Sequence, residues 1–242
     1  MLSNNQIKLI KQLKQKKFRQ QYNLFIAEGV KSVNEFLNSK FKAKDIFATN
    51  DYINIYNSKK LQIISENELK KISSYKSPNQ VVGVFEISEN VKKIKSGLTL
   101  VLDDINDPGN LGTIIRLCDW FGIDQLVCSK NTVDCYNSKT VQASMGSLSR
   151  IPVVYTDIDA FLKKDKRPIY GAFLEGENIY KSTLKLNAIL VVGNEANGIS
   201  KSIEKNISHK ITIPHFSENQ QTESLNVAMA TSILLSEFKR FK

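Results

Sequence analysis

The second part of the chain alternates short apolar runs with stretches of helical spacing, and this alternation limits the folds open to it. The apolar runs have strand length and lie at residues 98–103, 125–129, 152–155, 168–173, 188–192 and 210–213. The helical stretches lie at residues 111–121, 138–148, 158–163 and 225–239. Strands that alternate with helices predict a parallel sheet covered on both faces. In such sheets, ligands bind at the carboxyl ends of the strands.

The first part of the chain reads as a smaller α/β domain. We expect helices at residues 2–17 and 30–38, and strands at residues 24–27, 45–48, 62–64 and 80–86. The segment 88–97 is polar and rich in lysine, which is typical of a linker. The predicted organisation is therefore a domain at 1–90 followed by a domain at 97–242.

The charge of the chain points to an acidic partner. The formal net charge is +10, and the first twenty residues contain six cations and no acid. A solvated helix face would explain these cations, and so would contact with a phosphate backbone. Nucleic acid is the first candidate partner.

Several other classes of protein are not expected. The sequence has no apolar stretch of membrane-spanning length and no apolar signal core at its start, so we expect no membrane and a cytoplasmic location. Cys118, Cys128 and Cys135 are too far apart for a zinc pair and too few for a disulfide framework, and His209 and His215 have no spaced partner. We expect no metal.

The first motif with chemical content runs from Asp103 to Gly122. A strand ends at Asp103, a turn follows, and a helix begins near Leu111. Arg116 is the only cation between Lys95 and Lys130. A surface helix with one arginine is the plain interpretation, and a buried arginine would need a partner. The glycines do not form a nucleotide-binding P-loop or a dinucleotide fingerprint.

Two further motifs follow. In residues 190–200, "LVVGNEANGIS", a buried strand ends at Gly193 and a tight loop carries Glu195. A simple turn with a solvated carboxylate is the alternative. In residues 211–240 a strand runs into Pro214, a polar loop follows, and the residues from Thr222 to Asn226 open the long helix expected at 225–239. Thr222 or Ser224 is a candidate helix cap.

Together and in this order, the three motifs resemble a known family. Asn110-x-Gly112-x-x-x-Arg116, then Gly193-Asn194-Glu195-x-x-Gly198-Ile199, then Ile213-Pro214 with Ser224-Leu225-Asn226-Val227 are similar to the signatures of the SpoU (TrmH-type) RNA ribose 2′-O-methyltransferases, within the SPOUT superfamily. The similarity spans about residues 98–240, and residues 17–37 more weakly resemble the family's RNA-binding domain. The loop 215–223 is longer than the family's short loop.

The resemblance implies a fold, a cofactor and an activity. The fold would be a parallel-sheet α/β methyltransferase domain with a C-terminal trefoil knot, preceded by a small α/β RNA-binding domain. The chain would bind S-adenosylmethionine through Gly193, Ile213 and Leu225 and act as a homodimer. It would methylate a ribose 2′-hydroxyl of structured RNA, with ribosomal RNA preferred and transfer RNA as the alternative.

The resemblance also assigns catalytic residues. Arg116 would be catalytic, either as the base or as an electrostatic stabiliser of the attacking oxygen, in its own subunit or across the dimer. Glu195 would orient Arg116 or the ribose. Asn110, Ser224 and Asn226 would complete the hydrogen-bond frame.

Two rival interpretations remain. A non-catalytic RNA-binding assembly factor of the same fold would be expected to lack Arg116, Glu195 or Asn226, and the sequence has all three. A doubly wound dehydrogenase would need the glycine fingerprint that is absent.

Overall fold

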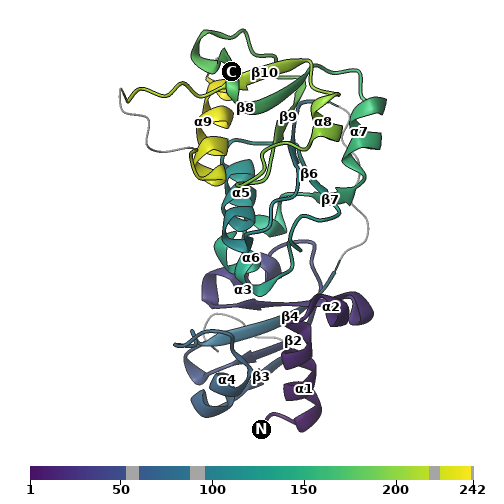
Figure 1. The fold of residues 1–242 in the computed structure, drawn as a ribbon. Coiled ribbons are helices and arrows are strands. Elements are labelled where there is room, and N and C mark those ends of the chain that lie inside the picture. The colour runs from purple at the N-terminus through teal and green to yellow at the C-terminus, as the bar shows by residue number, and fades with distance from the viewer. Residues whose placement is uncertain (53–59, 88–95, 218–223, 241–242) are drawn as a thin grey trace. The chain divides into compact units, whose positions relative to one another are not determined.

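The computed structural model describes residues 1–52, 60–87, 96–217 and 224–240. The chain forms two compact units, Met1–Asn90 with Asp134–Arg150, and Val91–Val133 with Ile151–Lys242 (Figure 1). The predicted domains, 1–90 and 97–242, stay a prediction, and most of the expected linker lies outside the described residues. The packing adds that the segment Asp134–Arg150 belongs with the first unit.

Among the described residues, the first unit contains a mixed sheet with the strand order β1-β4-β2-β3. Strand β4 is antiparallel to β1 and β2, and β3 is parallel to β2. The strands are β1 (Leu24–Glu28), β2 (Ala43–Ala48), β3 (Leu61–Ile63) and β4 (Val81–Glu86). The helices are α1 (Asn4–Leu13), α2 (Lys16–Tyr22), α3 (Val30–Leu37), α4 (Glu66–Ile72) and α6 (Ser138–Ala143), with 3₁₀ turns at Asn50–Tyr52 and Ser147–Ser149.

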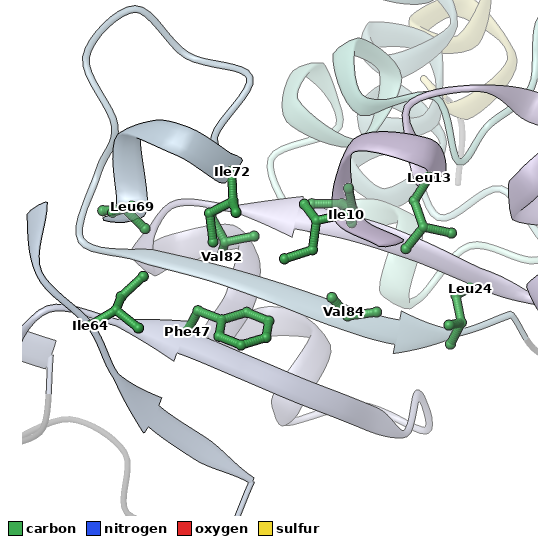
Figure 2. Close-up of a cluster of buried hydrophobic side chains, with 10 residues drawn as sticks. Ile10, Leu13, Leu24, Phe47, Ile64, Leu69, Ile72, Val82 and Val84 are labelled. Carbon is green, nitrogen blue, oxygen red and sulfur yellow. The ribbon is translucent and has the colours of Figure 1, made fainter. Parts of the chain in front are cut away.

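Both faces of this sheet are covered. Because successive side chains of a strand point to opposite faces, Leu24 and Ile26 lie on one face and Phe25 on the other. The first face packs against residues of α1 and α4, such as Ile10 and Leu69 (Figure 2). The second face carries a cluster of aromatic rings, formed by Phe25, Phe36, Phe41, Phe85 and Tyr136. Tyr136 brings the segment Asp134–Arg150 into this cluster.

A buried ion pair anchors the same segment. The Arg19 guanidinium, 3% exposed, lies 2.6 Å from an Asp134 carboxylate oxygen. It also donates 2.9 Å hydrogen bonds to the backbone carbonyls of Leu13 and Lys14. These carbonyls belong to the unsatisfied C-terminal end of α1, so Arg19 caps that helix. The single helix expected at residues 2–17 is therefore wrong, and the chain breaks between α1 and α2.

Among the described residues, the second unit contains a parallel sheet of six strands with the order β10-β8-β9-β5-β6-β7. The strands are β5 (Leu98–Leu102), β6 (Gln125–Ser129), β7 (Val153–Thr156), β8 (Ile169–Asn178), β9 (Ala188–Val192) and β10 (His209–Thr212). The helices are α5 (Pro108–Trp120), α7 (Ile158–Lys164), α8 (Lys201–Glu204) and α9 (Val227–Lys239), with a 3₁₀ turn at Ile179–Lys181.

Helices lie on both sides of this sheet (Figure 1). Helices α7 and α8 pack their apolar residues, such as Leu162 and Ile203, against Val101 and Val191 of the central strands. Helices α5 and α9 pack against each other. The predicted parallel α/β fold is confirmed. The trefoil knot stays a prediction, because strand pairing alone does not show how the chain is threaded.

Three local differences from the expected elements have physical causes. The helix expected at residues 138–148 ends at Ala143, because Met145 and Gly146 adopt positive φ angles of 51° and 94°. Helix α4 was not expected, although Ser65 and Glu68 form a capping box at its start. Helix α9 begins at Val227, and its cap is Asn226 instead of Thr222 or Ser224. Thr222 lies outside the described residues.

The buried ion pair yields a stability prediction. Asp134→Ala leaves Arg19 as an uncompensated buried charge, so we expect the opening free energy of the first unit to fall by about 3 kcal/mol. Glu35 and Arg150 form a half-exposed ion pair in the same unit, with exposed side-chain fractions of 34% and 45%. Glu35→Ala should cost less than about 1 kcal/mol. Hydrogen exchange of the β1 amides measures the opening free energy in both variants. An equal loss of opening free energy in Asp134→Ala and Glu35→Ala would contradict the stabilising role of the buried ion pair.

Candidate active site

The carboxyl ends of β5 and β9 lie side by side and define where the first two motifs meet. Leu102 pairs with Val192, and the Asp103 amide donates a 2.9 Å hydrogen bond to the Val192 carbonyl. The loops that follow these two strands therefore start from the same point at the edge of the sheet. This is the edge at which parallel α/β sheets bind ligands.

The first loop leads into helix α5. The Asp107 side chain accepts a 2.7 Å hydrogen bond from the Asn110 amide and caps the helix, and Pro108 occupies its first turn. Asn110 thus has a fixed position in the first turn. Arg116 lies further along the helix on its exposed side, and it makes no hydrogen bond or ion pair with another residue of the described ranges. Arg116 is not buried, so its charge needs no partner for folding.

The second loop is a tight turn closed on itself. Asn194 and Gly198 exchange two backbone hydrogen bonds of 3.0 and 2.9 Å. The Asn194 side-chain oxygen accepts from the amides of Ala196 and Asn197. Gly198 has a φ of 66°, a conformation that favours glycine. The loop therefore has little freedom, and it holds Glu195 in an exposed position.

Gly193 is required by the loop itself. A Cβ atom at this position would lie 2.2 Å from backbone atoms of Gly198 and Ile199. The close approach that we expected toward a cofactor is thus, in the structure, an approach of the chain to itself. A role of Gly193 in cofactor binding stays a prediction.

Side-chain amides connect the three motifs. The Asn110 side-chain amide donates a 2.7 Å hydrogen bond to a Glu195 carboxylate oxygen. The Asn110 side-chain oxygen accepts a 3.0 Å hydrogen bond from the side-chain nitrogen of Asn226. The Asn226 oxygen in turn accepts from the backbone amides of Ala228 and Met229 at the start of α9. The structure therefore brings Asn110, Glu195 and Asn226 together.

The direction of this relay is fixed by its two ends. A carboxylate can only accept hydrogen bonds, and backbone N–H groups can only donate them. Each asparagine between these ends must therefore donate through its nitrogen and accept through its oxygen, which sets the orientation of both amides. The structure shows an exposed Glu195 that is oriented by this relay.

The other predicted residues lie on neighbouring loops and make fewer contacts. Ile213 follows β10, whose Thr212 hydroxyl donates a 2.9 Å hydrogen bond to the Leu174 carbonyl. Leu225 is 51% exposed, and Leu174 is 74% exposed. Ser224 is exposed and makes no hydrogen bond with another described residue. Ser224 and Arg116 are thus not part of the relay in this structure.

No helix in the described ranges is long and apolar enough to cross a membrane.

Other reactive groups in the described ranges do not form a second catalytic site. No group of three histidine, cysteine or acidic side chains in those ranges could hold a metal ion. Burial, followed by the charge of Asp119, raises the pKa of the Cys118 thiol in α5. Cys118 therefore stays protonated at neutral pH and is a poor nucleophile.

Two residues of the site were not singled out from the sequence. Asp103 accepts a 2.8 Å hydrogen bond from the Ser200 amide, and the Asp104 carbonyl accepts a 2.7 Å hydrogen bond from the Asn194 side chain. Their position directly after a buried strand could have indicated a role at the edge of the sheet. Their partners lie almost a hundred residues away in the chain, so the sequence alone did not show the contacts.

Comparisons with known proteins identify the family to which this chain belongs. Residues 97–236 match the SpoU rRNA Methylase family, and residues 4–83 match the MRM3-like substrate binding domain. The chain therefore belongs to the SpoU rRNA methylase family, and the resemblance seen in the three motifs is confirmed.

Individual relatives are similar over the whole length. The chain is 30% identical to the Bacillus subtilis 23S rRNA (guanosine(2553)-2′-O)-methyltransferase RlmP, covering 96% of this chain and 95% of that protein. A TrmH-family structure from Porphyromonas gingivalis is 36% identical, with a TM-score of 0.92 and full coverage of both chains. An AdoMet-bound rRNA methyltransferase from Sinorhizobium meliloti is 27% identical, with a TM-score of 0.87, covering 100% of this chain and 96% of that one.

The relay predicts how substitutions of Asn226 affect stability. Asn226→Ala removes the cap of α9, which costs about 1 kcal/mol. The melting temperature should fall by about 2–4 °C for a domain of this size. Asn226→Ser keeps an oxygen that can cap the helix, so most of the loss should be recovered. Calorimetry measures both variants, and an unchanged melting temperature in Asn226→Ala would show that Asn226 does not cap α9.

Proposed function

We propose that this protein transfers the methyl group of S-adenosylmethionine to a ribose 2′-hydroxyl of ribosomal RNA. The observation that carries the proposal is the relay from Glu195 through Asn110 to Asn226, which joins the three family motifs at one edge of the sheet. The Bacillus subtilis relative, similar over almost its entire length, is a 23S rRNA 2′-O-methyltransferase. Transfer RNA is the alternative substrate.

The residues at the carboxyl edge of the sheet fit S-adenosylmethionine. Leu174 and Leu225 are large exposed apolar residues, and Leu174 is bonded through its carbonyl to Thr212, next to Ile213. An adenine ring is a planar partner for such apolar surfaces. We propose that Ile213 and Leu225 hold the cofactor, with the rigid loop that starts at Gly193 as a further wall. When bound, the cofactor supplies an electrophilic methyl group on a sulfonium. The structure from Sinorhizobium meliloti is AdoMet-bound, which supports S-adenosylmethionine as the cofactor.

The reaction sets clear demands on the protein. The ribose 2′-oxygen forms a bond to the methyl carbon while the carbon–sulfur bond breaks and its electron pair stays on sulfur. The hydroxyl proton passes to solvent, so charge is balanced, and the leaving thioether needs no acid. The protein must therefore stabilise negative charge on the attacking oxygen and hold the ribose in line.

We propose Arg116 for the first of these tasks. An arginine guanidinium is a cation with several hydrogen-bond donors and no acceptor, which makes it a poor base and a good partner for a developing alkoxide or a neighbouring phosphate. It is exposed and has no partner among the described residues, so it is available to substrate. Glu195, oriented by Asn110, would then hold the ribose or Arg116.

The first unit supplies the surface for RNA. It matches a substrate-binding domain, and the α1–α2 segment exposes lysines without an acidic residue among them. The exposed cations are Lys8, Lys11, Lys14, Lys16 and Lys17. Phe18 stacks on Tyr22, which is 40% exposed. Cations with an exposed aromatic ring are typical of surfaces that contact phosphates and bases.

We also propose a homodimer formed through α5 and α9. These helices run side by side, joined by the Asn226–Asn110 hydrogen bond near one end and by Lys239 to the Gly122 carbonyl near the other. Trp120 is 83% exposed and Met229 is 62% exposed, which is unfavourable in water. A second copy would cover both. Because Arg116 precedes Trp120 by one helical turn, the partner would lie close to Arg116.

A cytoplasmic location completes the proposal. The bacterial relatives act on ribosomal RNA by name, although a related protein of Xenopus tropicalis is mitochondrial.

The catalytic assignment is tested by Arg116→Ala. We expect turnover to fall by at least about a hundredfold, since one stabilising group of the transition state is lost. Affinity for S-adenosylmethionine should stay within about threefold of the original value, because Arg116 is not proposed to hold the cofactor. Mapping of 2′-O-methyl groups in ribosomal and transfer RNA, with and without the protein, gives the reference activity.

Thr113→Ala is the matched control for Arg116. Thr113 is exposed on the same helix, and among the described residues its hydroxyl bonds only the Gly109 carbonyl of that helix. This variant should keep full turnover. Residual activity near the original level in Arg116→Ala, or weakened cofactor binding alone, would refute the catalytic role.

The proposed dimer is tested by Trp120→Glu. A carboxylate in place of a large apolar side chain within an interface is costly, so we expect the dissociation constant to rise by at least about a hundredfold. Leu186→Glu alters another exposed apolar residue of the same unit, 39% exposed, and should leave association unchanged. Sedimentation equilibrium measures both, and a dimer that is equally stable in all variants would exclude this interface.

A further inference from the structure

We propose that Asp103 is a positioning residue for the loop that carries Glu195. Residues 193–200 are called the Glu195 loop below. The Asp103 carboxylate fixes the far end of this loop, and the Asp104 carbonyl fixes its near end. The inference rests on the proposed methyl transfer for its effect on rate, and on the geometry alone for its effect on the loop.

Both ends of the Glu195 loop are tied to two consecutive residues. At the near end, the Asn194 side-chain amide donates a 2.7 Å hydrogen bond to the Asp104 carbonyl. At the far end, the Ser200 amide donates a 2.8 Å hydrogen bond to an Asp103 carboxylate oxygen. The exposed carboxylate of Glu195 lies between these two attachments. Its position therefore depends on the end of strand β5.

The end of β5 is itself held rigidly. Asp104 has a φ of 61°, an uncommon conformation for a residue other than glycine. Its amide donates a 3.0 Å hydrogen bond to the Ser129 hydroxyl, and the Ile105 amide donates to the Thr132 hydroxyl. The hydroxyls of Ser129 and Thr132 are 3.0 Å apart and bonded to each other. A strained residue kept in place by buried polar groups is typical of functional sites.

A buried carboxylate is a costly way to hold a loop unless its geometry matters. Asp103 is 6% exposed, and a buried charge loses most of its hydration. In return, its hydrogen bond to the Ser200 amide is charge-assisted, and therefore shorter and stronger than a neutral one. This bond therefore attaches the far end of the Glu195 loop strongly to the end of β5.

Asp124 shows what a structural residue at a strand end looks like. Its carboxylate accepts a 3.1 Å hydrogen bond from the Leu98 amide at the opposite, amino end of β5. Asp124 is exposed, and the end of β5 that it binds is the end opposite to the Glu195 loop. The two aspartates thus make the same kind of bond at the two ends of one strand. Only Asp103 holds a loop that carries a site residue.

The consequence for the reaction follows from the relay. If the far end of the loop is released, Glu195 is less well placed to accept the 2.7 Å hydrogen bond from Asn110. The Asn110 side chain then loses its fixed orientation, and its hydrogen bond from the Asn226 side chain is weakened. Misplacement of such groups by about 1 Å is enough to reduce turnover by orders of magnitude.

The experiment compares Asp103→Ala, Asp103→Asn and Asp124→Ala in the full chain. At saturating S-adenosylmethionine and RNA, Asp103→Ala should lower kcat by about tenfold, with KM values within about threefold. Asp103→Asn keeps an oxygen for the Ser200 amide and should recover kcat to within about threefold of the original. Asp124→Ala should lower the melting temperature and leave kcat unchanged. Should Asp103→Ala not fold, Asp103→Thr, with a shorter hydroxyl, replaces it.

Hydrogen exchange provides a readout that needs no substrate. The amides of Ala196, Asn197 and Ser200 should exchange faster in Asp103→Ala and at the original rate in Asp124→Ala. Unchanged loop exchange in Asp103→Ala, or an equal loss of kcat in Asp124→Ala, would overturn the positioning role. Absence of 2′-O-methylation by the unmodified protein would instead reject the proposed function, while the exchange data would still decide the role of Asp103.

Discussion

The in-register pairing of β5 with β9 is the constraint on which the rest of the site depends. Parallel strands bring their carboxyl ends to one edge, and the hydrogen bond from Asp103 to Val192 places the two following loops together. One loop then leads into α5 with Asn110, and the other turns back immediately with Glu195. Residues separated by 85 positions in the chain thereby come within hydrogen-bond distance.

The relay of amides shows how a carboxylate can be both exposed and well oriented. Glu195 avoids the cost of burial because it faces solvent, yet Asn110 fixes one of its oxygens. The direction of Asn110 is in turn set by Asn226, whose own oxygen binds the backbone at the start of α9. Asn226 therefore caps α9 with its oxygen and orients Asn110 with its nitrogen. The same side chain contributes to the fold and to the site.

Much of the secondary structure was predictable from apolar periodicity, for physical reasons. Strand β9 was expected with its observed bounds, because five consecutive apolar residues end at a glycine. The break between α1 and α2 differs from the single expected helix, because the Arg19 side chain turns back onto the Leu13 and Lys14 carbonyls while it pairs with the distant Asp134. Local patterns predict elements well, but they do not show which polar groups a side chain will satisfy.

The sequence by itself determined the parallel α/β class, the order of the three motifs and the identity of Asn110, Glu195 and Asn226 as site candidates. The fold class depends on periodicity, which is a local property, and the site candidates depend on the resemblance of the three motifs to a known family. Only the tertiary structure decided that Glu195 is exposed, that Gly193 packs against its own loop, and that Asp103 ties the end of that loop. The bond from Ser200 to Asp103 depends on which strands become neighbours, and strand order is set by packing of the whole sheet. The contact of Gly193 depends on how the turn closes on itself.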